Sequence, residues 1–349
     1  MKISFDKPVG VVGAGGFGTV VANILSANAQ VYLYARKPQV VEQMITSGFS
    51  HGQKLKPGVT PTGDLQMMAD QCEILFPVVP SSAFRESIKK LAPFLHPYHI
   101  LIHGTKGLDI KLSPGKSLDD YTQLTREQVL TMSEVIQEET DVLRVGCLAG
   151  PNLAKEIADN QPAATVVASR FEEVIQLGQK LLRNDMFQVY GNQDLIGIEL
   201  CGVLKNIIAI ASGALSGLGL GENARALLIS RGMVEMIHLG VALGGNTKAF
   251  LGLAGIGDLV ATCTSTLSRN YTVGYRMAKG ENLDDIISSM EEVAEGVKTI
   301  KITKKLVKYY KIRAPITEMT YKVLFENLSA DDALQYLMKY PFNVDIDFL

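Results

Sequence analysis

The sequence predicts two domains: an α/β domain built on a doubly wound, mostly parallel sheet over residues 1–190, and an all-α domain over residues 191–349. Two observations lead to this prediction. In the first half, short apolar runs alternate with helical stretches, which is typical of a parallel sheet covered by helices. After Gly191 the strand pattern fades and long helical stretches follow. A chain of 349 residues is long enough to form two such cores.

The expected elements follow from the length and flanks of each apolar run. Short runs bounded by turn residues predict six strands, at residues 9–13, 31–35, 74–79, 100–103, 145–149 and 164–168. Longer periodic stretches predict four helices, at residues 195–214, 223–243, 284–309 and 315–338. Residues 111–143 contain a Ser-Pro-Gly turn and a charged amphipathic stretch. We expect them to form a surface element that carries no site.

The first predicted strand leads into a glycine-rich turn, Gly13-x-Gly15-x-x-Gly18, and an apolar-periodic helix follows. In a Rossmann-type fold Gly13 allows the sharp turn, Gly15 lets the backbone approach a pyrophosphate, and Gly18 lets the helix pack closely on the strand. The helix N-terminus then offers N–H groups and a positive dipole end to the phosphates. The strand–turn–helix context predicts a dinucleotide site, whereas the glycines alone would also fit an ordinary turn.

The second predicted strand ends in Arg36-Lys37. An NAD-selective fold usually has Asp or Glu about 20 residues after the glycines, where it accepts a hydrogen bond from the ribose 2′-OH. A guanidinium at that place can instead pair with a 2′-phosphate. We therefore expect NADP or NAD as the cofactor. The alternative is a solvated Arg-Lys pair at a strand end.

Composition excludes several classes of function. The formal net charge of −2 gives no reason to expect attraction to nucleic acid or a membrane surface. The four cysteines lie far apart and the five histidines form no metal-binding motif, so we expect no metal site. The N-terminus lacks a charged leader followed by an apolar core and a cleavage site. These observations predict a reduced, cytoplasmic protein.

One apolar segment, residues 196–220, resembles a membrane span in length, but Glu199, Lys205 and Asn206 interrupt it. A charged residue near the centre of a membrane helix costs about 2.5–3.5 kcal/mol on insertion scales. A buried central helix of a globular domain is the better interpretation, and we expect no membrane span. Lysine is almost never fully buried without a partner, so Lys205 needs an explanation.

A dehydrogenase that borrows hydride chemistry from its cofactor must still supply a proton donor or acceptor. Lys205 fits this role, because burial lowers the pKa of a lysine toward working pH. Glu199 is six residues away and so lies off its helical face, and its partner must come from elsewhere. A structural lysine at a helix end or interface is the alternative.

A second group of candidates lies in the segment from Leu253 to Thr262 and in Ser268-Arg269-Asn270. Asp258 could cap the helix that follows it, or it could be a residue of the functional site. Ser-Arg-Asn offers donors suited to a phosphate or carboxylate, although Arg269 could equally form a surface salt bridge. Lys106, which follows an apolar strand, is a further cation at an expected cleft edge. Together these groups predict a small phosphorylated or carboxylated substrate.

The motifs and their order resemble the NAD(P)-dependent glycerol-3-phosphate dehydrogenase family. The similar segments, which run along nearly the whole chain, are Gly13-Ala14-Gly15-Gly16-Phe17-Gly18, Thr105-Lys106-Gly107, Ala149-Gly150-Pro151-Asn152, the stretch from Glu199 to Ile207, Gly221-Glu222-Asn223-Ala224, the stretch from Leu253 to Leu259 with Thr262-Cys263, Ser268-Arg269-Asn270 and Val293-Ala294-Glu295-Gly296. The resemblance implies a Rossmann-type domain followed by an all-α domain of the 6-phosphogluconate-dehydrogenase-like kind. It also implies reduction of dihydroxyacetone phosphate to sn-glycerol 3-phosphate, the precursor of glycerophospholipids.

The resemblance further implies roles for individual residues. Lys205 matches the family's proton donor/acceptor, and in the implied mechanism Asp258 supports Lys205 or a substrate hydroxyl. The positions that match substrate contacts are Lys106, Asn206, Asp258, Thr262, Ser268, Arg269 and Asn270. Those that match cofactor contacts are Gly13, Gly15, Gly16, Phe17, Gly18, Arg36, Lys106, Ala154, Arg269, Val293 and Glu295. Phe17 stands where bacterial members often carry Trp, and Asn152-Leu153 replaces a more usual Ser-Phe, so the cofactor contacts near Asn152 depart from the family pattern.

Two competing functions stay open at this point. The chain could be a related two-domain dehydrogenase that acts on another hydroxy acid or ketoacid, such as ketopantoate. It could also be a non-catalytic NAD(P) sensor, although Lys205 argues against that. We expect a small-molecule partner, no nucleic acid, and a homodimer, because helical second domains of this plan often pair.

Overall fold

The computed structural model describes residues 7–290 and 293–341, and the chain divides into two compact units. The first unit comprises Met1–Asp109 and Thr131–Leu195, and the second comprises Ile110–Leu130 and Ile196–Leu349. The sequence-based division at residue 190 differs from this in two respects, because residues 110–130 belong to the second unit and the first unit extends to Leu195.

Specific contacts explain why residues 110–130 belong there. Leu124 is fully buried, and its backbone N–H donates to the carbonyl of Lys305 at 3.3 Å. The guanidinium of Arg126 donates from Nε to the carbonyl of Leu243, just past the end of a long helix, at 3.0 Å. A cation at a helix C-terminus is favourable because it neutralises the dipole. The expectation of a simple surface element was therefore wrong for this part of the segment 111–143.

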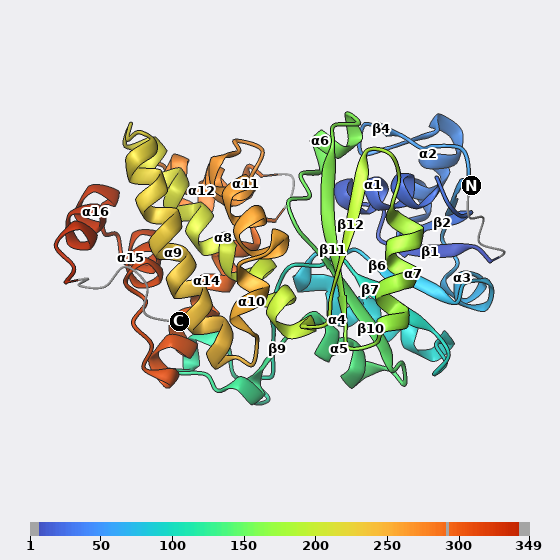
Figure 1. Cartoon of the computed structure of the whole chain (residues 1–349), viewed down its shortest axis with the longest axis horizontal. Helices are drawn as coiled ribbons and strands as arrows, with labels where there is room; N and C mark the ends of the chain where they lie inside the picture. Colours follow the sequence, from blue (N-terminus) through green and yellow to red (C-terminus); the bar gives the residue numbers. More distant parts are fainter. Residues whose placement is uncertain (1–6, 291–292, 342–349) are drawn as a thin grey trace. The chain divides into compact units, whose positions relative to one another are not determined.

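The first unit is built on an eight-stranded sheet with the order β12-β11-β10-β7-β6-β1-β2-β5 (Figure 1). Its strands are β1 (Val9–Val12), β2 (Val31–Tyr34), β5 (Val59–Thr62), β6 (Ile74–Pro77), β7 (Ile100–His103), β10 (Arg144–Ala149), β11 (Ala163–Ser169) and β12 (Phe187–Asn192). Every neighbouring pair is parallel except β10 with β11. The predicted mostly parallel, doubly wound sheet is confirmed, and so are all six predicted strands.

Sequence patterns did not predict the two outermost strands, β5 and β12. Strand β5 has the sequence Val-Thr-Pro-Thr, in which proline argues against a central strand but is tolerated at an edge. Strand β12 alternates buried and exposed residues from Phe187 onward, which is expected where a strand is covered on one face only. Two minor two-stranded sheets, β3 (Phe49–Ser50) with β4 (Gln53–Lys54) and β8 (Asp109–Ile110) with β9 (Val129–Leu130), complete the strands of the described residues.

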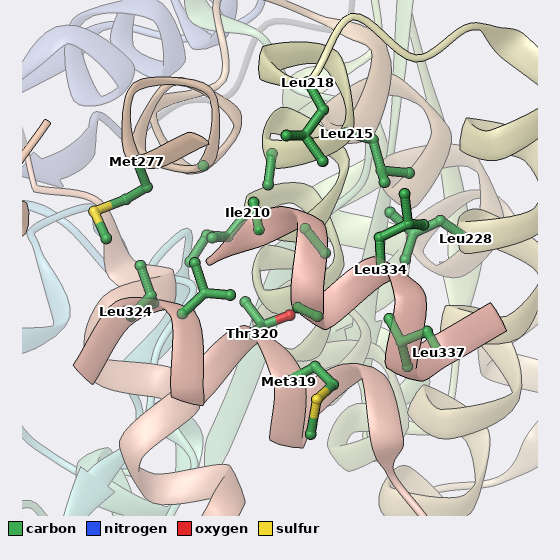
Figure 2. A pocket seen from close by; sticks show the side chains of 16 residues that line it. Ile210, Leu215, Leu218, Leu228, Met277, Met319, Thr320, Leu324, Leu334 and Leu337 are labelled. Atoms are coloured by element: carbon green, nitrogen blue, oxygen red, sulfur yellow. The ribbon is translucent and has the colours of Figure 1, made fainter. Parts of the chain in front are cut away.

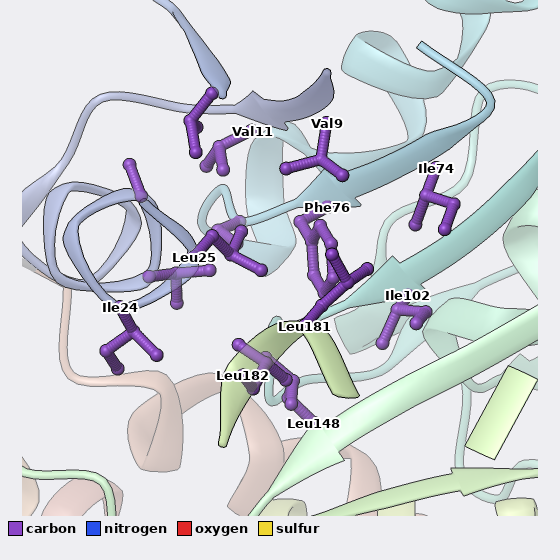
Figure 3. Close-up of a cluster of buried hydrophobic side chains, with 14 of the residues drawn as sticks. Val9, Val11, Ile24, Leu25, Ile74, Phe76, Ile102, Leu148, Leu181 and Leu182 are labelled. Atoms are coloured by element: carbon purple, nitrogen blue, oxygen red, sulfur yellow. The ribbon is translucent and has the colours of Figure 1, made fainter. Parts of the chain in front are cut away.

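Helices of the first unit connect the strands and cover the sheet. They are α1 (Gly16–Leu25), α2 (Pro38–Ser47), α3 (Leu65–Gln71), α4 (Ser81–Leu91), α5 (Met132–Glu139), α6 (Ala154–Ala158) and α7 (Glu172–Leu182). Figure 3 shows how Leu25 of α1 and Leu181 of α7 approach Phe76 and Ile102 of the sheet. Each fully buried side chain of this size contributes about 1.5–3 kcal/mol, so the core fixes β1 and α1 on either side of the glycine turn.

The described part of the second unit is dominated by helices (Figure 1). They are α8 (Leu195–Gly217), α9 (Glu222–Ala242), α10 (Thr247–Phe250), α11 (Asp258–Thr264), α12 (Arg269–Ala278), α13 (Leu283–Ser288), α14 (Glu295–Tyr310), α15 (Pro315–Phe325) and α16 (Ala330–Met338). The predicted stretches 195–214 and 223–243 correspond to α8 and α9. The stretch 284–309 forms two helices instead of one, and part of it lies outside the described residues. The stretch 315–338 also divides, because Asn327 adopts a positive φ of 55° that ends the helical path.

Helix α8 is the central helix of the second unit. It has the length and apolar composition of a membrane span, but 89% of its most apolar window is buried inside the protein. Its close contact with α12 depends on glycine, because a Cβ on Gly213 would lie 1.9 Å from the carbonyl oxygen of Tyr271. A Cβ on Gly274 would likewise lie 1.8 Å from the carbonyl oxygen of Ile210. The interpretation of this segment as a buried central helix is confirmed.

Farther along α8, apolar side chains surround a cavity of about 50 Å³ (Figure 2). Ile210 and Leu215 of α8 line it together with Met319 of α15 and Leu334 of α16. The hydroxyl of Thr320, which also lines it, donates to the carbonyl of Ile316 at 2.7 Å and so is satisfied within its own helix. This end of α8 therefore packs mainly through apolar side chains, and the charged residues Glu199 and Lys205 lie closer to its start.

Candidate active site

The glycine turn after β1 has the geometry that its sequence predicts. Gly13 adopts a φ of 121°, and a Cβ there would lie 2.3 Å from the carbonyl oxygen of Val78. A Cβ on Gly18 would lie 1.8 Å from the carbonyl oxygen of Gly13, so the first turn of α1 packs directly on the chain that leaves the strand. Apart from Gly15 and its two chain neighbours, no residue has an atom within 4 Å of the position where a Cβ of Gly15 would stand. Two glycines thus allow close packing, and the third leaves open space.

That open space lies at the N-terminus of α1, where Gly15 is the cap residue and no side chain caps the helix. The first N–H groups of a helix have no partner within it, and together with the dipole they form an anion site. A helix start without a side-chain cap, beside a space that a Cβ would fill, fits a pyrophosphate. The residues present therefore fit a dinucleotide cofactor.

A small hairpin formed by β3 and β4 lies against this turn. Ser50 donates from Oγ to the carbonyl of Ala14 at 3.3 Å, and Gln53 donates from Nε2 to the carbonyl of Gly16 at 3.2 Å. Thr19 of α1 donates to Ser50 Oγ at 2.9 Å and so joins the hairpin to the helix. The sequence did not predict that this hairpin holds the glycine turn in place, because each strand of the hairpin has only two residues. The turn between them, His51-Gly52, was the only local signal.

The other predicted cofactor residues of the first unit occupy strand ends. Phe17 of α1 lies beside Gly104, where a Cβ would be 3.2 Å from its ring. Lys106 donates from Nζ to the carbonyl of Gly150 at 2.9 Å, which joins the segments after β7 and β10. Ala154 begins α6 after β10, and Arg36 is exposed just after β2. All four thus follow the glycine turn or the carboxyl end of a strand, where ligands of open α/β sheets bind.

In the second unit, Lys205 of α8 lies in a buried cluster with two residues of α11. Its ammonium group forms an ion pair with the carboxylate of Asp258 and donates to Thr262 Oγ1 at 2.5 Å. Lys205 is 5% exposed and Asp258 is 1% exposed. A buried charge requires a partner of opposite sign, and Asp258, a candidate site residue from the sequence, supplies it.

The geometry of α11 explains why Asp258 reaches the lysine. Asp258 does not cap a helix, since Leu253–Gly257 already form a π-helical turn that runs straight into α11. The capping alternative is therefore wrong. Thr262 donates its hydroxyl proton to the carbonyl of Asp258 at 2.6 Å, which leaves its lone pairs for the ammonium of Lys205. Burial also raises the pKa of the neighbouring Cys263 thiol to about 12, so this thiol stays neutral beside the ion pair.

Ser212, which sequence reasoning missed, fixes the register of the cluster. It is fully buried on α8 and donates from Oγ to the carbonyl of Cys263 at 2.7 Å. This bond ties the end of α11 to the helix that carries Lys205. A serine in an apolar helix gives no sequence signal for such a contact, because its partner lies 51 residues away.

The Ser268-Arg269-Asn270 segment forms the beginning of α12. Ser268 is its N-cap and accepts from the backbone N–H of Tyr271 at 3.3 Å. Arg269 donates to the carbonyl of Val293 at 2.9 Å. Asn270 accepts at Oδ1 from the backbone N–H of Gly296 at 2.9 Å, so its Nδ2 remains a donor without a partner among the described residues. This segment therefore presents an amide donor and a cation at a helix N-terminus, which suits an anion.

The structure thus brings the predicted residues together in two groups. Within the second unit Lys205, Asp258 and Thr262 are in direct contact, and the start of α12 is linked to the Val293–Gly296 segment. Asn206, which follows Lys205, donates from Nδ2 to the carbonyl of Gly202 in its own helix at 3.4 Å. Within the described residues no group of three or more His, Cys, Asp or Glu side chains could hold a metal ion.

Comparisons with known proteins agree along the whole chain. The model described as the N-terminus of NAD-dependent glycerol-3-phosphate dehydrogenase matches residues 8–175, and the model of its C-terminus matches residues 194–335. A relative from Ectopseudomonas mendocina, named glycerol-3-phosphate dehydrogenase (NAD(P)+), is 39% identical over 98% of this chain and 97% of its own. A relative of the same name from Pseudomonas aeruginosa is 37% identical over 99% of this chain and 98% of its own.

Solved structures support the same assignment. The crystal structure of a glycerol-3-phosphate dehydrogenase from Coxiella burnetii has a TM-score of 0.84 and 32% identity, and it covers 96% of this chain and 99% of that chain. A ketopantoate reductase from Ralstonia eutropha has a TM-score of 0.55 at 14% identity, which shows a shared fold and nothing more. The chain therefore belongs to the glycerol-3-phosphate dehydrogenase family of NAD(P)-dependent oxidoreductases.

Proposed function

We propose that this chain reduces dihydroxyacetone phosphate to sn-glycerol 3-phosphate, with Lys205 as the proton donor and, in the reverse direction, the proton acceptor. The observation that carries the proposal is the buried cluster of Lys205, Asp258 and Thr262. Stability alone does not explain a buried ion pair of this kind, because replacing such a pair by well-packed apolar residues is often neutral or stabilising.

The reaction adds a hydride to the substrate's carbonyl carbon and a proton to its oxygen. When bound, NAD(P)H supplies the hydride. Lys205 donates the proton from Nζ to the forming alkoxide and is left neutral beside Asp258. Asp258 and Thr262 hold Nζ in place, and an ammonium group within hydrogen-bond reach of the carbonyl oxygen also stabilises the negative charge that develops there.

Substrate selection rests on the phosphate. Arg269 and Asn270 begin α12 and offer a guanidinium and a free amide N–H, so we assign them to the phosphate of the substrate. Ser268 already accepts from Tyr271 N, and its contribution is to hold this turn. Lys106 stays assigned to the substrate and the cofactor, and Asn206 to the substrate.

The cofactor assignment rests on the glycine turn and on Arg36. Gly13, Gly15, Gly16, Phe17 and Gly18 would hold the pyrophosphate and its flank. Arg36 is exposed at the end of β2, where a guanidinium would pair with a 2′-phosphate. Ala154, Arg269, Val293 and Glu295 complete the set assigned to the cofactor. We infer that NADP is used at least as well as NAD.

The biological setting follows from the same assignment. The product is a precursor of glycerophospholipids, so we place the enzyme in lipid biosynthesis. We also infer a cytoplasmic location and a homodimer.

The direct test is NADPH oxidation followed at 340 nm with and without dihydroxyacetone phosphate, run beside NADH. Oxidation that depends on dihydroxyacetone phosphate supports the proposal. Oxidation with ketopantoate or another ketoacid, and none with dihydroxyacetone phosphate, would overturn the substrate. No activity with either cofactor on any of these substrates would favour a sensor.

A further inference from the structure

Helix α14 and the loop after it form a strongly basic segment. Between Gly296 and Thr317 the sequence contains seven cationic residues and no Asp or Glu, although the whole chain carries a formal net charge of −2. The cations are Lys298, Lys301, Lys304, Lys305, Lys308, Lys311 and Arg313. A local excess of one sign can attract a partner of the opposite sign even when the net charge is close to zero.

Three of these cations are engaged in the fold of the second unit. The contacts are an ion pair of Lys301 with Asp119 at 4.0 Å, an ion pair of Lys304 with Glu326 at 2.8 Å, and a hydrogen bond from Lys305 to the carbonyl of Tyr121. These side chains hold neighbouring segments together, so their charges need no partner outside the chain.

The three cations at the end of α14 differ. Lys308, Lys311 and Arg313 are exposed and form no ion pair with any described residue. Lys308 in the last turn already interacts favourably with the helix dipole. Lys311 is the C-cap and has a φ of 55°, a left-handed conformation that favours glycine or asparagine. Helix termination alone would therefore not select a lysine there.

Exposed tyrosine rings accompany these cations. Tyr309, in the last turn of α14, is 42% exposed, and Cζ of Arg313 lies 6.0 Å from the ring centre of Tyr340. The ring of Tyr340 lies 5.9 Å from that of Tyr336 on α16, which is 46% exposed. We call this group the basic-aromatic surface, and its residues are Lys308, Tyr309, Lys311, Arg313, Tyr336 and Tyr340.

The chemistry of this surface favours an anionic lipid bilayer as its partner. Lysine and arginine close to a bilayer are attracted to anionic headgroups, and tyrosine is enriched at the interface between membrane and water. A single-stranded nucleic acid would need open ring faces on which its bases stack. Here Arg313 covers a face of Tyr340, and the ring of Tyr336 contacts that of Tyr340. A second copy of the chain is disfavoured, because a two-fold interface would bring the cations of both copies together.

We propose that the basic-aromatic surface binds the anionic face of a lipid bilayer reversibly. The three cations contact the headgroups, and the tyrosine rings lie at the level of the headgroups. This binding does not depend on which substrate the active site reduces, and it involves no residue assigned to the substrate or the cofactor.

Co-sedimentation of the full chain with vesicles at low ionic strength tests this. One set of vesicles contains equal parts of phosphatidylcholine and phosphatidylglycerol, and the other contains phosphatidylcholine alone. The wild type should bind the anionic vesicles and not the neutral ones. The triple variant Lys308→Gln, Lys311→Gln and Arg313→Gln should bind the anionic vesicles about 100-fold more weakly, since each cation near such a surface contributes about fivefold. Tyr309→Ser should weaken binding by a smaller factor.

The matched control is the triple variant Lys89→Gln, Lys90→Gln and Lys180→Gln, which removes three exposed lysines of the first unit and has the same net charge. It should bind anionic vesicles like the wild type, and thermal melting verifies that each variant is folded. A wild type that does not bind anionic vesicles would overturn the inference, and so would an equal loss of binding in both triple variants. Tighter binding of the wild type to a single-stranded oligonucleotide than to the vesicles would also overturn it, in favour of a nucleic acid.

Discussion

The glycine turn of the first unit and the lysine cluster of the second unit achieve specificity in opposite ways. At the turn, Gly13, Gly15 and Gly18 act through missing side chains, and the groups offered to a ligand are backbone N–H groups. In the cluster, Lys205 and Asp258 act through buried, charged side chains on two helices 53 residues apart. The turn is local and works through the backbone, whereas the cluster is long-range and works through side chains.

This difference determines how each region should respond to mutation. A site built from backbone groups tolerates most changes in the chemistry of neighbouring side chains. It does not tolerate a larger side chain in place of its glycines, because the added atoms would overlap other backbone atoms or the bound ligand. A buried ion pair tolerates changes of volume better than the loss of one charge, which leaves the other uncompensated at a cost of about 3–5 kcal/mol. Substitutions at Lys205, Gly15 and Gly18 test these opposite sensitivities.

The largest effect is expected from Lys205→Ala. Loss of a general acid lowers kcat by about 10²–10⁴-fold, while the affinity for NADPH, to which Lys205 is not assigned, should not change. Steady-state kinetics and calorimetric titration with NADPH measure the two quantities.

Because Lys205→Ala leaves Asp258 buried without its partner, the double variant Lys205→Met with Asp258→Asn serves as the folding control. Its melting temperature should exceed that of Lys205→Ala, and its kcat should be equally low. Recovery of turnover in the double variant would show that Lys205 serves stability and not proton transfer.

Glu235 tests whether other buried charges of the second unit behave like the lysine cluster. Burial raises its pKa to about 7, although its carboxylate accepts from the backbone N–H groups of Ile316 and Thr317 at the start of α15. An acid whose pKa is raised in the folded state loses stability as pH rises from its unfolded pKa to its folded one. Between pH 4.5 and 7 the wild type should lose roughly 3 kcal/mol relative to Glu235→Gln. Urea melts of both proteins at several pH values measure this, and parallel pH curves would contradict it.

Two substitutions separate the two functions of the glycine turn, which are to bind the cofactor and to pack α1 closely on the chain that leaves β1. Gly15→Ala places a Cβ where no residue other than its chain neighbours has an atom within 4 Å, so melting should be unchanged while NADPH binds at least about tenfold more weakly. Gly18→Ala places a Cβ 1.8 Å from the carbonyl oxygen of Gly13, so both stability and binding should fall. Thermal melting with and without NADPH distinguishes them, and a tight-binding Gly15→Ala variant would argue against a pyrophosphate above that glycine.

The smallest effect is expected from Ser268→Ala. Its hydroxyl oxygen already caps α12, so its loss should cost about 1 kcal/mol of stability, and the KM for dihydroxyacetone phosphate should rise little. Asn270→Ala is the matched comparison, because its Nδ2 has no partner among the described residues and its loss should raise that KM. Equal increases of KM in both variants would assign Ser268 a direct contact with the substrate.

The comparison also explains how much the sequence could predict. The glycine turn was predictable residue by residue, because strand, turn and helix are contiguous and each glycine has a steric requirement. The central strands were predictable as well, since strands covered on both faces read as continuous apolar runs. The edge strands β5 and β12 were not predicted, because neither has a continuous apolar run. Strand β5 contains a proline, and strand β12 is covered on one face only, so its buried and exposed residues alternate.

The lysine cluster was only half predictable. A lysine in an apolar helix shows that a partner exists, but helical spacing excluded Glu199 and gave no way to choose Asp258. The choice depends on how α11 packs on α8, which Ser212 fixes through the carbonyl of Cys263. The segment 110–130 was misassigned for the same reason, because its contacts with Lys305 and Leu243 are distant in sequence.

The central claim is that backbone at the glycine turn binds the cofactor while Lys205 transfers the proton. The most direct test measures the NADPH affinity and the single-turnover rate with saturating NADPH and dihydroxyacetone phosphate in Gly15→Ala and Lys205→Ala. The account predicts weaker NADPH binding with a nearly normal rate in Gly15→Ala, and normal binding with a rate at least about 100-fold lower in Lys205→Ala. A near-normal rate in Lys205→Ala, or both quantities impaired alike in both variants, would contradict it.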